Sequence, residues 1–175
     1  GPWQPVRPLA SAEVLTYRRA QQEPEKDVTD QAIVTRRPVG AGSVIAVHGP
    51  LFRDYFLGHY PLLRRFIAGL VDRLHIPWEV TVEAPPRLEL IVRRKDGALV
   101  VNLINRGAGE ALSPNRVIVE ELPPVTNVVL RIRCVCAPES VTVAPAGQTP
   151  KWAYADGTLT IELPRVDVHC AIIVA

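Results

Sequence analysis

The sequence predicts a mostly β protein in which a partial α/β segment of flavodoxin type, with one main helix, precedes an antiparallel β-sandwich. Three observations lead to this prediction. Strand-like runs separated by turn residues fill the chain after Pro77, where no helical period returns. Before Pro77, one stretch has apolar residues every three or four positions, as in an amphipathic helix. Two Asp-Gly pairs in the second half are typical of tight hairpin turns.

The first half contains one strand-like run and one hairpin. β-Branched and aromatic residues at 12–18 favour a strand, and the polar stretch 21–27 favours a loop. The runs 32–39 and 43–48 flank the turn Gly40-Ala41-Gly42, and two strand-like runs around such a turn predict a β-hairpin.

The helix is predicted to cover residues 61–74. Apolar residues take one face of this stretch and arginines the other. Pro61 suits the first helical turn, where its missing amide hydrogen costs nothing, and Pro77 ends the helix because the residue before a proline avoids the helical region. Residues 52–56 are expected to form a looser turn before it.

The second half is predicted to be all β. Asp96-Gly97 and Asp156-Gly157 should each close a hairpin, because both residue types accept the positive φ that a two-residue turn requires. Several short strands at this spacing predict a two-sheet sandwich. The strand-like runs are residues 78–83, 88–93, 99–105, 117–122, 128–136, 140–143, 158–163 and 168–174.

The change of pattern predicts two domains, 1–77 and 78–175. The first is incomplete as an α/β domain, because one hairpin, one strand and one helix cannot cover both faces of a parallel sheet. Gly1-Pro2 is typical of the remnant of a removed expression tag, and the chain has no Met. We therefore expect a truncated chain whose first domain needs apolar partners.

Composition excludes several classes of partner. The 20 basic and 18 acidic residues leave a formal net charge of +2, which argues against nucleic acid as a partner. No apolar run reaches the ~20 residues that cross a bilayer as a helix, so we expect no membrane contact. The N-terminus has no signal-peptide pattern and the cysteines are odd in number, which favours a soluble, cytoplasmic protein. Cys134 and Cys136 are expected to be buried or half-buried strand thiols rather than zinc ligands.

The order of motifs resembles a known family along nearly the whole chain. The stretch GAGSVIAVHGPLFRDY at 40–55, followed by LRRFIAGL at 63–70, resembles the end of the glutamine-amidotransferase-like domain in β-galactosidases of the trimerising type and related hypothetical glycosyl hydrolases. LVVNLIN at 99–105 and GTLTIELPRVDVHCAIIV at 157–174 are similar to strands of the C-terminal sandwich of these bacterial enzymes.

The resemblance implies a non-catalytic accessory region of a glycoside hydrolase. The family's catalytic carboxylates belong to an upstream barrel of roughly 250 residues, for which this chain has no room. The implied role is to support domain packing and oligomer contacts, with the rest of the parent hydrolase and a homo-oligomer as partners. The family's amidotransferase-like domain is understood to lack glutaminase chemistry, and we expect no cofactor and no metal.

Asp54, Tyr55, His59 and Tyr60 form the densest polar and aromatic cluster. An acid beside a histidine could act in general acid–base catalysis near neutral pH. Such residues also serve as helix caps and aromatic anchors, and we favour this reading, with a subunit or interdomain contact as the functional alternative to catalysis. An independent enzyme that uses Asp54 and His59 is the least favoured hypothesis.

Trp78, Trp152 and Tyr154 are the candidates for an aromatic platform, and Trp152 and Tyr154, two residues apart, share a face on a strand. This geometry suits an aromatic platform that stacks on a sugar ring, and it suits a core wall equally well. Core or interdomain packing is favoured, and the alternative function is a self-standing carbohydrate-binding sandwich. His48 and His169, each alone on an apolar strand, are expected to be hydrogen-bonded scaffolding, and Asn102 and Asn105 to satisfy backbone groups near a strand end.

Overall fold

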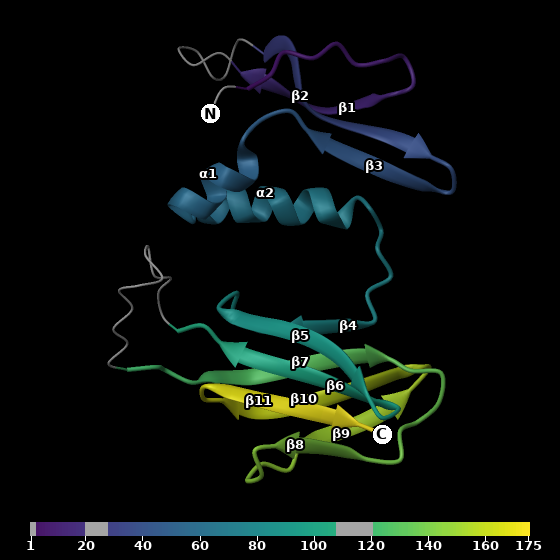
Figure 1. Cartoon of the computed structure of the whole chain (residues 1–175), viewed down its shortest axis with the longest axis vertical. Coiled ribbons are helices and arrows are strands. Elements are labelled where there is room, and N and C mark those ends of the chain that lie inside the picture. The colour runs from purple at the N-terminus through teal and green to yellow at the C-terminus, as the bar shows by residue number, and fades with distance from the viewer. Residues whose placement is uncertain (1–2, 20–27, 108–120) are drawn as a thin grey trace. The chain divides into compact units, whose positions relative to one another are not determined.

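The computed structural model describes residues 3–19, 28–107 and 121–175. The chain divides into two compact units, Gly1–Pro77 and Trp78–Ala175, drawn in Figure 1. The described residues form three antiparallel sheets and two helices. The predicted mostly β class, with a small helical part and a sandwich, is therefore confirmed.

The first unit is built on a three-stranded sheet in the order β1-β2-β3. The strands are β1 (Glu13–Arg19), β2 (Val28–Val39) and β3 (Gly42–Val47). Gly40 has a φ of 56° in the β2–β3 turn, so the predicted hairpin and its glycine turn are confirmed. Both strand pairs are antiparallel, so the described part of this unit contains no parallel pair of the flavodoxin type.

Two helices follow the sheet, α1 (Leu51–Gly58) and α2 (Pro61–Asp72). The expected loose turn at 52–56 is wrong, because these residues belong to α1. Leu51 is 3% exposed and packs in the core of this unit, and such burial stabilises a helix too short to persist alone. Pro61 occupies the first turn of α2, as predicted.

The core of the first unit is small. Figure 1 shows both helices along one side of the sheet, and the buried cluster between them consists of Val34, Leu51 and Leu70. Trp3 adds to its edge, because the indole lies where a side chain on Gly49 would stand and the amide of Gln4 donates to His48 O at 2.9 Å. Three buried members, counted among the described residues, are few for the core cluster of a unit of this length.

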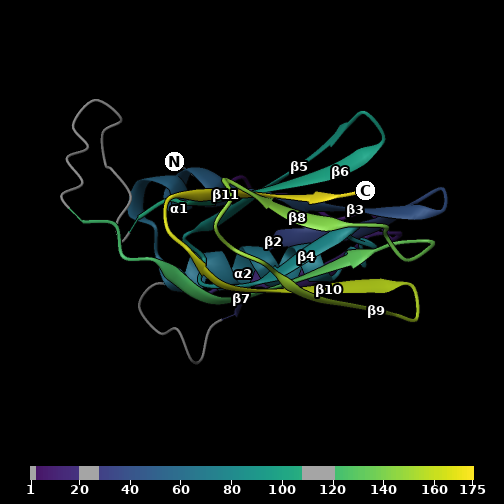
Figure 2. The same cartoon turned by 90° about the horizontal axis from the view of Figure 1, so that it is seen from below.

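The second unit is a β-sandwich, as predicted. One sheet has the order β4-β7-β10-β9 and the other β5-β6-β11-β8; Figure 2 shows them as two layers. Both Asp-Gly pairs form their turns, with positive φ at Asp96, Gly97, Asp156 and Gly157. The strands are β4 (Val80–Glu83), β5 (Leu88–Lys95), β6 (Ala98–Asn105), β7 (Val125–Arg133), β8 (Val141–Ala144), β9 (Lys151–Ala155), β10 (Thr158–Val166) and β11 (His169–Val174).

Inward-facing residues of both sheets form one core of 17 buried side chains. Their alternation is regular, as in β6, where Leu99, Val101 and Leu103 are buried and the residues between them are half-buried. A continuous cluster across both sheets is what holds a sandwich together.

Of the predicted segments, one strand ends earlier than expected, and two others lie wholly or mostly outside the described residues. The run 128–136 was predicted as one strand, but β7 ends at Arg133, which pairs with Thr158, the first residue of β10. The amide of Cys134 donates to Gly157 O at 2.9 Å in the same register, and the chain bends at residues 135–136. The predicted loop 21–27 and most of the predicted strand 117–122 lie outside the described residues. Within the described part of the chain, no helix has the length and apolar character that crossing a membrane requires.

Candidate functional site

The four residues predicted as contact sites form two separate pairs. Tyr55 and His59 belong to α1 and its C-terminal cap in the first unit, whereas Trp152 and Tyr154 belong to β9 in the second.

Tyr55 and His59 contact each other through their rings. His59 follows α1 in the left-handed conformation, with a φ of 47°, and its amide donates to Tyr55 O at 2.7 Å. The ring centroids of Tyr55 and His59 lie 5.8 Å apart in an edge-on arrangement, and Phe56 lies 6.2 Å from the same imidazole. The imidazole thus serves as an aromatic anchor at the helix end, as the residue types predicted. The two side chains remain candidates for a subunit or interdomain contact.

Trp152 and Tyr154 share a face of β9 but differ in their surroundings. Tyr154 is half-buried against the sandwich core, and its hydroxyl lies 3.3 Å from Cys134 O and 3.2 Å from Val135 O. Trp152 is 42% exposed on β9, which lies at the edge of its sheet. Because Tyr154 packs into the wall of the core, a sugar-stacking surface here would rest on Trp152.

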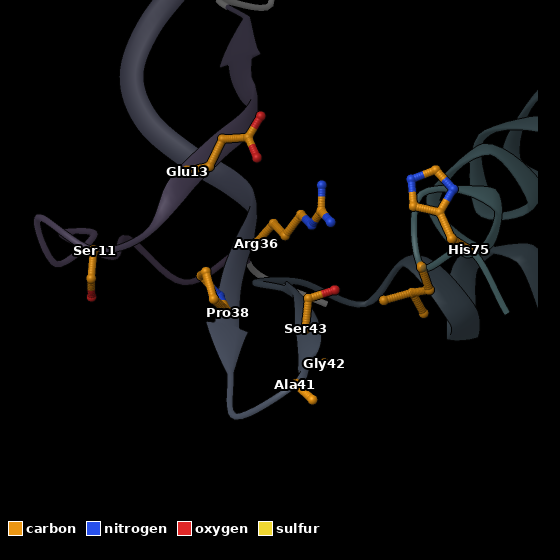
Figure 3. A pocket seen from close by; sticks show the side chains of 9 residues that line it. Ser11, Glu13, Arg36, Pro38, Ala41, Gly42, Ser43 and His75 are labelled. Carbon is orange, nitrogen blue, oxygen red and sulfur yellow. The ribbon is translucent and has the colours of Figure 1, made fainter.

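An open hollow of about 660 Å³ lies in the first unit, and sequence reasoning missed it. Glu13 on β1 stands directly opposite Arg36 on β2 in the strand register. Figure 3 shows their side chains reaching into the hollow, with His75 on the side across from them. Ser11 and Ser43 add hydroxyl groups at the rim. No sequence signal joins these residues, because their proximity depends on strand pairing across residues 20–27.

The hollow supplies hydrogen-bonding groups rather than a catalytic pair. Its lining contains one carboxylate, Glu13, whereas hydrolysis of a glycosidic bond ordinarily requires two carboxyl groups about 5–9.5 Å apart. The arginine, the imidazole and the hydroxyl groups could hold a polar molecule in an exposed position.

Two carboxylates on the sandwich strands form cross-strand ion pairs. Glu83 pairs with Arg131 and Glu89 with Arg106; Glu83 and both arginines are exposed, and Glu89 is half-buried. Glu121 and Glu162 are exposed, and Glu120 lies outside the described residues. These positions are typical of solvent-facing side chains on a sheet.

The lone histidines and the two asparagines form hydrogen bonds with other residues of their own unit. His48 Nε2 lies 2.9 Å from Thr35 Oγ1, and His169 Nε2 lies 3.2 Å from Asn102 Oδ1. The buried amide of Asn105 donates to Pro123 O at 2.9 Å and to Asp167 O at 2.7 Å, and its oxygen accepts from the Gly107 amide at 3.2 Å. The expectation that Asn105 satisfies backbone groups is confirmed.

The cysteines differ from the expected pair of strand thiols. Cys134 is half-buried, but Cys136 is exposed, and both follow the end of β7. Burial, and then the nearby Cys136 and Glu79, raise the pKa of Cys134, and Arg94 opposes this. Cys170 is buried in the sandwich core, and burial raises its pKa to about 11. All three thiols are free.

The comparisons with known proteins give a fold and no family. No family model matches the chain. No curated protein is similar in sequence. Among solved structures, alpha-L-fucosidase isoenzyme 2 from Paenibacillus thiaminolyticus is similar over 98% of this chain, with a TM-score of 0.66 and 14% sequence identity. The chain matches 26% of the length of that protein. At this identity the similarity shows a shared fold.

Proposed function

We propose that this chain is a non-catalytic accessory region of a glycoside hydrolase, which supports domain packing and oligomer contacts around a catalytic barrel. The observation that supports this most is the similarity of both units together to one quarter of an alpha-L-fucosidase chain. A sandwich alone is a common architecture, but a small helix-covered sheet followed by a sandwich over 98% of the chain is a more specific arrangement.

The small core of the first unit also supports the proposal. Among the described residues, its buried cluster has three members, whereas that of the sandwich has 17. A unit with so little buried apolar surface gains stability by packing against another protein surface. The amidotransferase-like character of this unit and a β-galactosidase parent belong to the same proposal, as does a cytoplasmic location, with which the three free thiols agree.

Expression of the longest natural reading frame that contains this chain tests the proposal. We expect that polypeptide to hydrolyse at least one of a panel of 4-nitrophenyl glycosides, and the 175-residue chain alone to hydrolyse none. Removal of the accessory region should lower the thermal midpoint of the remaining enzyme while leaving its catalytic carboxylates in place. A reading frame without a region of barrel length, or hydrolysis by this chain alone, would contradict the proposal.

A carbohydrate-binding sandwich is the second candidate, and the exposed indole of Trp152 is the observation in its favour. Titration with oligosaccharides should then change tryptophan emission, and Trp152→Ala should abolish the change. Trp78→Ala tests the other exposed indole of the possible platform, and a loss of the emission change in this variant alone would assign the binding to Trp78. Emission that stays constant across neutral and acidic oligosaccharides would exclude this function.

A further inference from the structure

The hollow in the first unit is lined by polar side chains that have no partner within the described part of the chain. No hydrogen bond or ion pair among the described residues involves the side chain of Glu13, Arg36 or His75. Glu13 and Arg36 stand opposite each other in the strand register, yet both side chains reach into the hollow instead of pairing (Figure 3). An acceptor and a donor are therefore open to a molecule that enters the hollow.

The imidazole on the other side of the hollow belongs to a residue with a strained backbone. His75 follows the end of α2 with a φ of 50°, and its amide donates to Asp72 O at 3.1 Å. A residue with a Cβ is strained in this left-handed region, and glycine is the usual residue there after a helix. Strained residues of this kind cluster at ligand sites, so the position points to a role for the imidazole itself.

The polar groups of the lining match a neutral ligand with several hydroxyl groups. The Arg36 guanidinium only donates hydrogen bonds, the Glu13 carboxylate only accepts them, and the Ser43 hydroxyl does both. A ligand with neighbouring hydroxyl groups can accept from the guanidinium and donate to the carboxylate at the same time. A simple anion would meet the like charge of Glu13 and a simple cation that of Arg36, so repulsion disfavours both.

The hollow also has the size and the apolar surface that suit a sugar ring. Its volume of about 660 Å³ lies within the range of about 300–1,000 Å³ that is common for small-molecule sites. Pro38 and Leu74 line it beside the polar groups. Apolar side chains can contact the C–H face of a sugar ring while the hydroxyl groups at its edge bond to the polar side chains.

We propose that this hollow binds a neutral saccharide. Arg36 donates to one hydroxyl group of a ring, Glu13 accepts from its neighbour, and His75 bonds to the sugar from the other side. The site lies wholly in the first unit, whereas Trp152 belongs to the second. The choice of a saccharide among polyhydroxylated ligands rests on the proposed function, but binding requires neither a barrel nor hydrolysis, so the two proposals can fail separately.

Nuclear magnetic resonance on the ¹⁵N-labelled full chain tests the proposal. Titration with lactose, cellobiose and maltose should shift the backbone amides of Arg36, Ser43 and His75 for at least one sugar. The dissociation constant should be on the order of 1 mM, because the site is open to solvent. Inorganic phosphate, an anion, and glycine, a zwitterion, should each bind at least about 10-fold more weakly, because the lining is charge-balanced and spaced for hydroxyl groups.

Substitutions separate binding from stability. Arg36→Gln and Glu13→Gln each replace a charged group by an amide, and each should weaken binding at least about 10-fold. His75→Gly removes the imidazole and relieves the backbone strain, so it should weaken binding while the thermal midpoint stays the same or rises. Arg37→Gln is the matched control, because Arg37 is the next residue of β2, is exposed and lies outside the lining.

Three results would overturn the proposal. The first is the absence of amide shifts at these residues with all three disaccharides up to roughly 50 mM, about 50 times the expected dissociation constant. The second is wild-type affinity in Arg36→Gln, or in His75→Gly, which keeps the fold. The third is tighter binding of phosphate or glycine than of any disaccharide, because the hollow would then be a site for charged ligands.

Discussion

At the scale of single residues, the buried amide of Asn105 has the clearest energetic consequence. Its hydrogen bonds join the end of β6 to Pro123 and Asp167, and Asn105→Ala leaves their two part-buried carbonyl groups without this donor. We expect a loss of about 2–3 kcal/mol of unfolding free energy, measured by urea denaturation. Asn102→Ala is the control, because Asn102 contacts His169 on the exposed face, and it should cost under about 0.5 kcal/mol. Equal losses for both variants would contradict this account.

The buried thiol of Cys170 makes stability depend on alkaline pH. Its pKa is raised to about 11 from an ordinary value of 9.0, because burial disfavours the thiolate. The folded state therefore binds the proton more tightly than the unfolded state, so this contribution is complete below pH 9 and is lost as the pH rises toward 11. We expect a fall of about 2 kcal/mol over that range in urea denaturation.

The control for this prediction is Cys170→Ala, which should make the pH dependence between 9 and 11 shallower. Cys136, which is exposed, should react with iodoacetamide at pH 8 in the folded protein, whereas Cys170 should react only after unfolding. Rapid labelling of Cys170 in the folded state would contradict the burial of this thiol in the sandwich core.

The sequence predicts residue roles well where the cause is local. Asn105 follows a run of alternating apolar residues, so its role as a partner of backbone groups at a strand end was foreseeable. The opposition of Glu13 and Arg36 was not, because it depends on the register of two strands separated by residues 20–27. The exposure of Cys136 was also missed, since β7 ends at Arg133, where its distant partner strand β10 begins at Thr158.

At the scale of elements, the Asp-Gly turns fix the register of their hairpins. Gly157 has a φ of 74°, where a residue with a Cβ is strained, and the site has room for the added carbon. Gly157→Ala should therefore lower the unfolding free energy of the sandwich by about 1 kcal/mol through backbone strain alone. Asp156→Asn is the control and should be nearly neutral, because Asn tolerates the left-handed region as well as Asp does. Both are measured by thermal unfolding.

The helices, strands and turns that could be predicted are those whose sequence signals lie within a few neighbouring residues. The β2–β3 hairpin and the two Asp-Gly turns have local sequence causes, and they were predicted correctly. Helix α1 was taken for a loose turn, because its eight residues lack a strong period and depend on the burial of Leu51 against distant Val34. Packing between residues far apart in the chain cannot be inferred from a short stretch of sequence.

At the scale of the whole molecule, the two units should differ in their ability to fold alone. Residues 78–175 have a core of 17 buried side chains, and we expect them to unfold cooperatively when expressed alone, with a midpoint within about 5 °C of the full chain. Residues 1–77, whose buried cluster has three members, should show little near-ultraviolet circular dichroism. A cooperative transition for residues 1–77 alone would contradict this expectation.

One consequence of the Asn105 side chain concerns how this sandwich can vary among proteins. The carboxamide of Asn105 accepts a hydrogen bond from the Gly107 amide, shortly after the end of β6, and donates one to Pro123 O, shortly before the start of β7. The distance between these two points is therefore fixed by one residue of the scaffold and not by the sequence that connects them. The positions of Gly107 and Pro123 should therefore be kept in related sandwiches in which the sequence between these two residues differs.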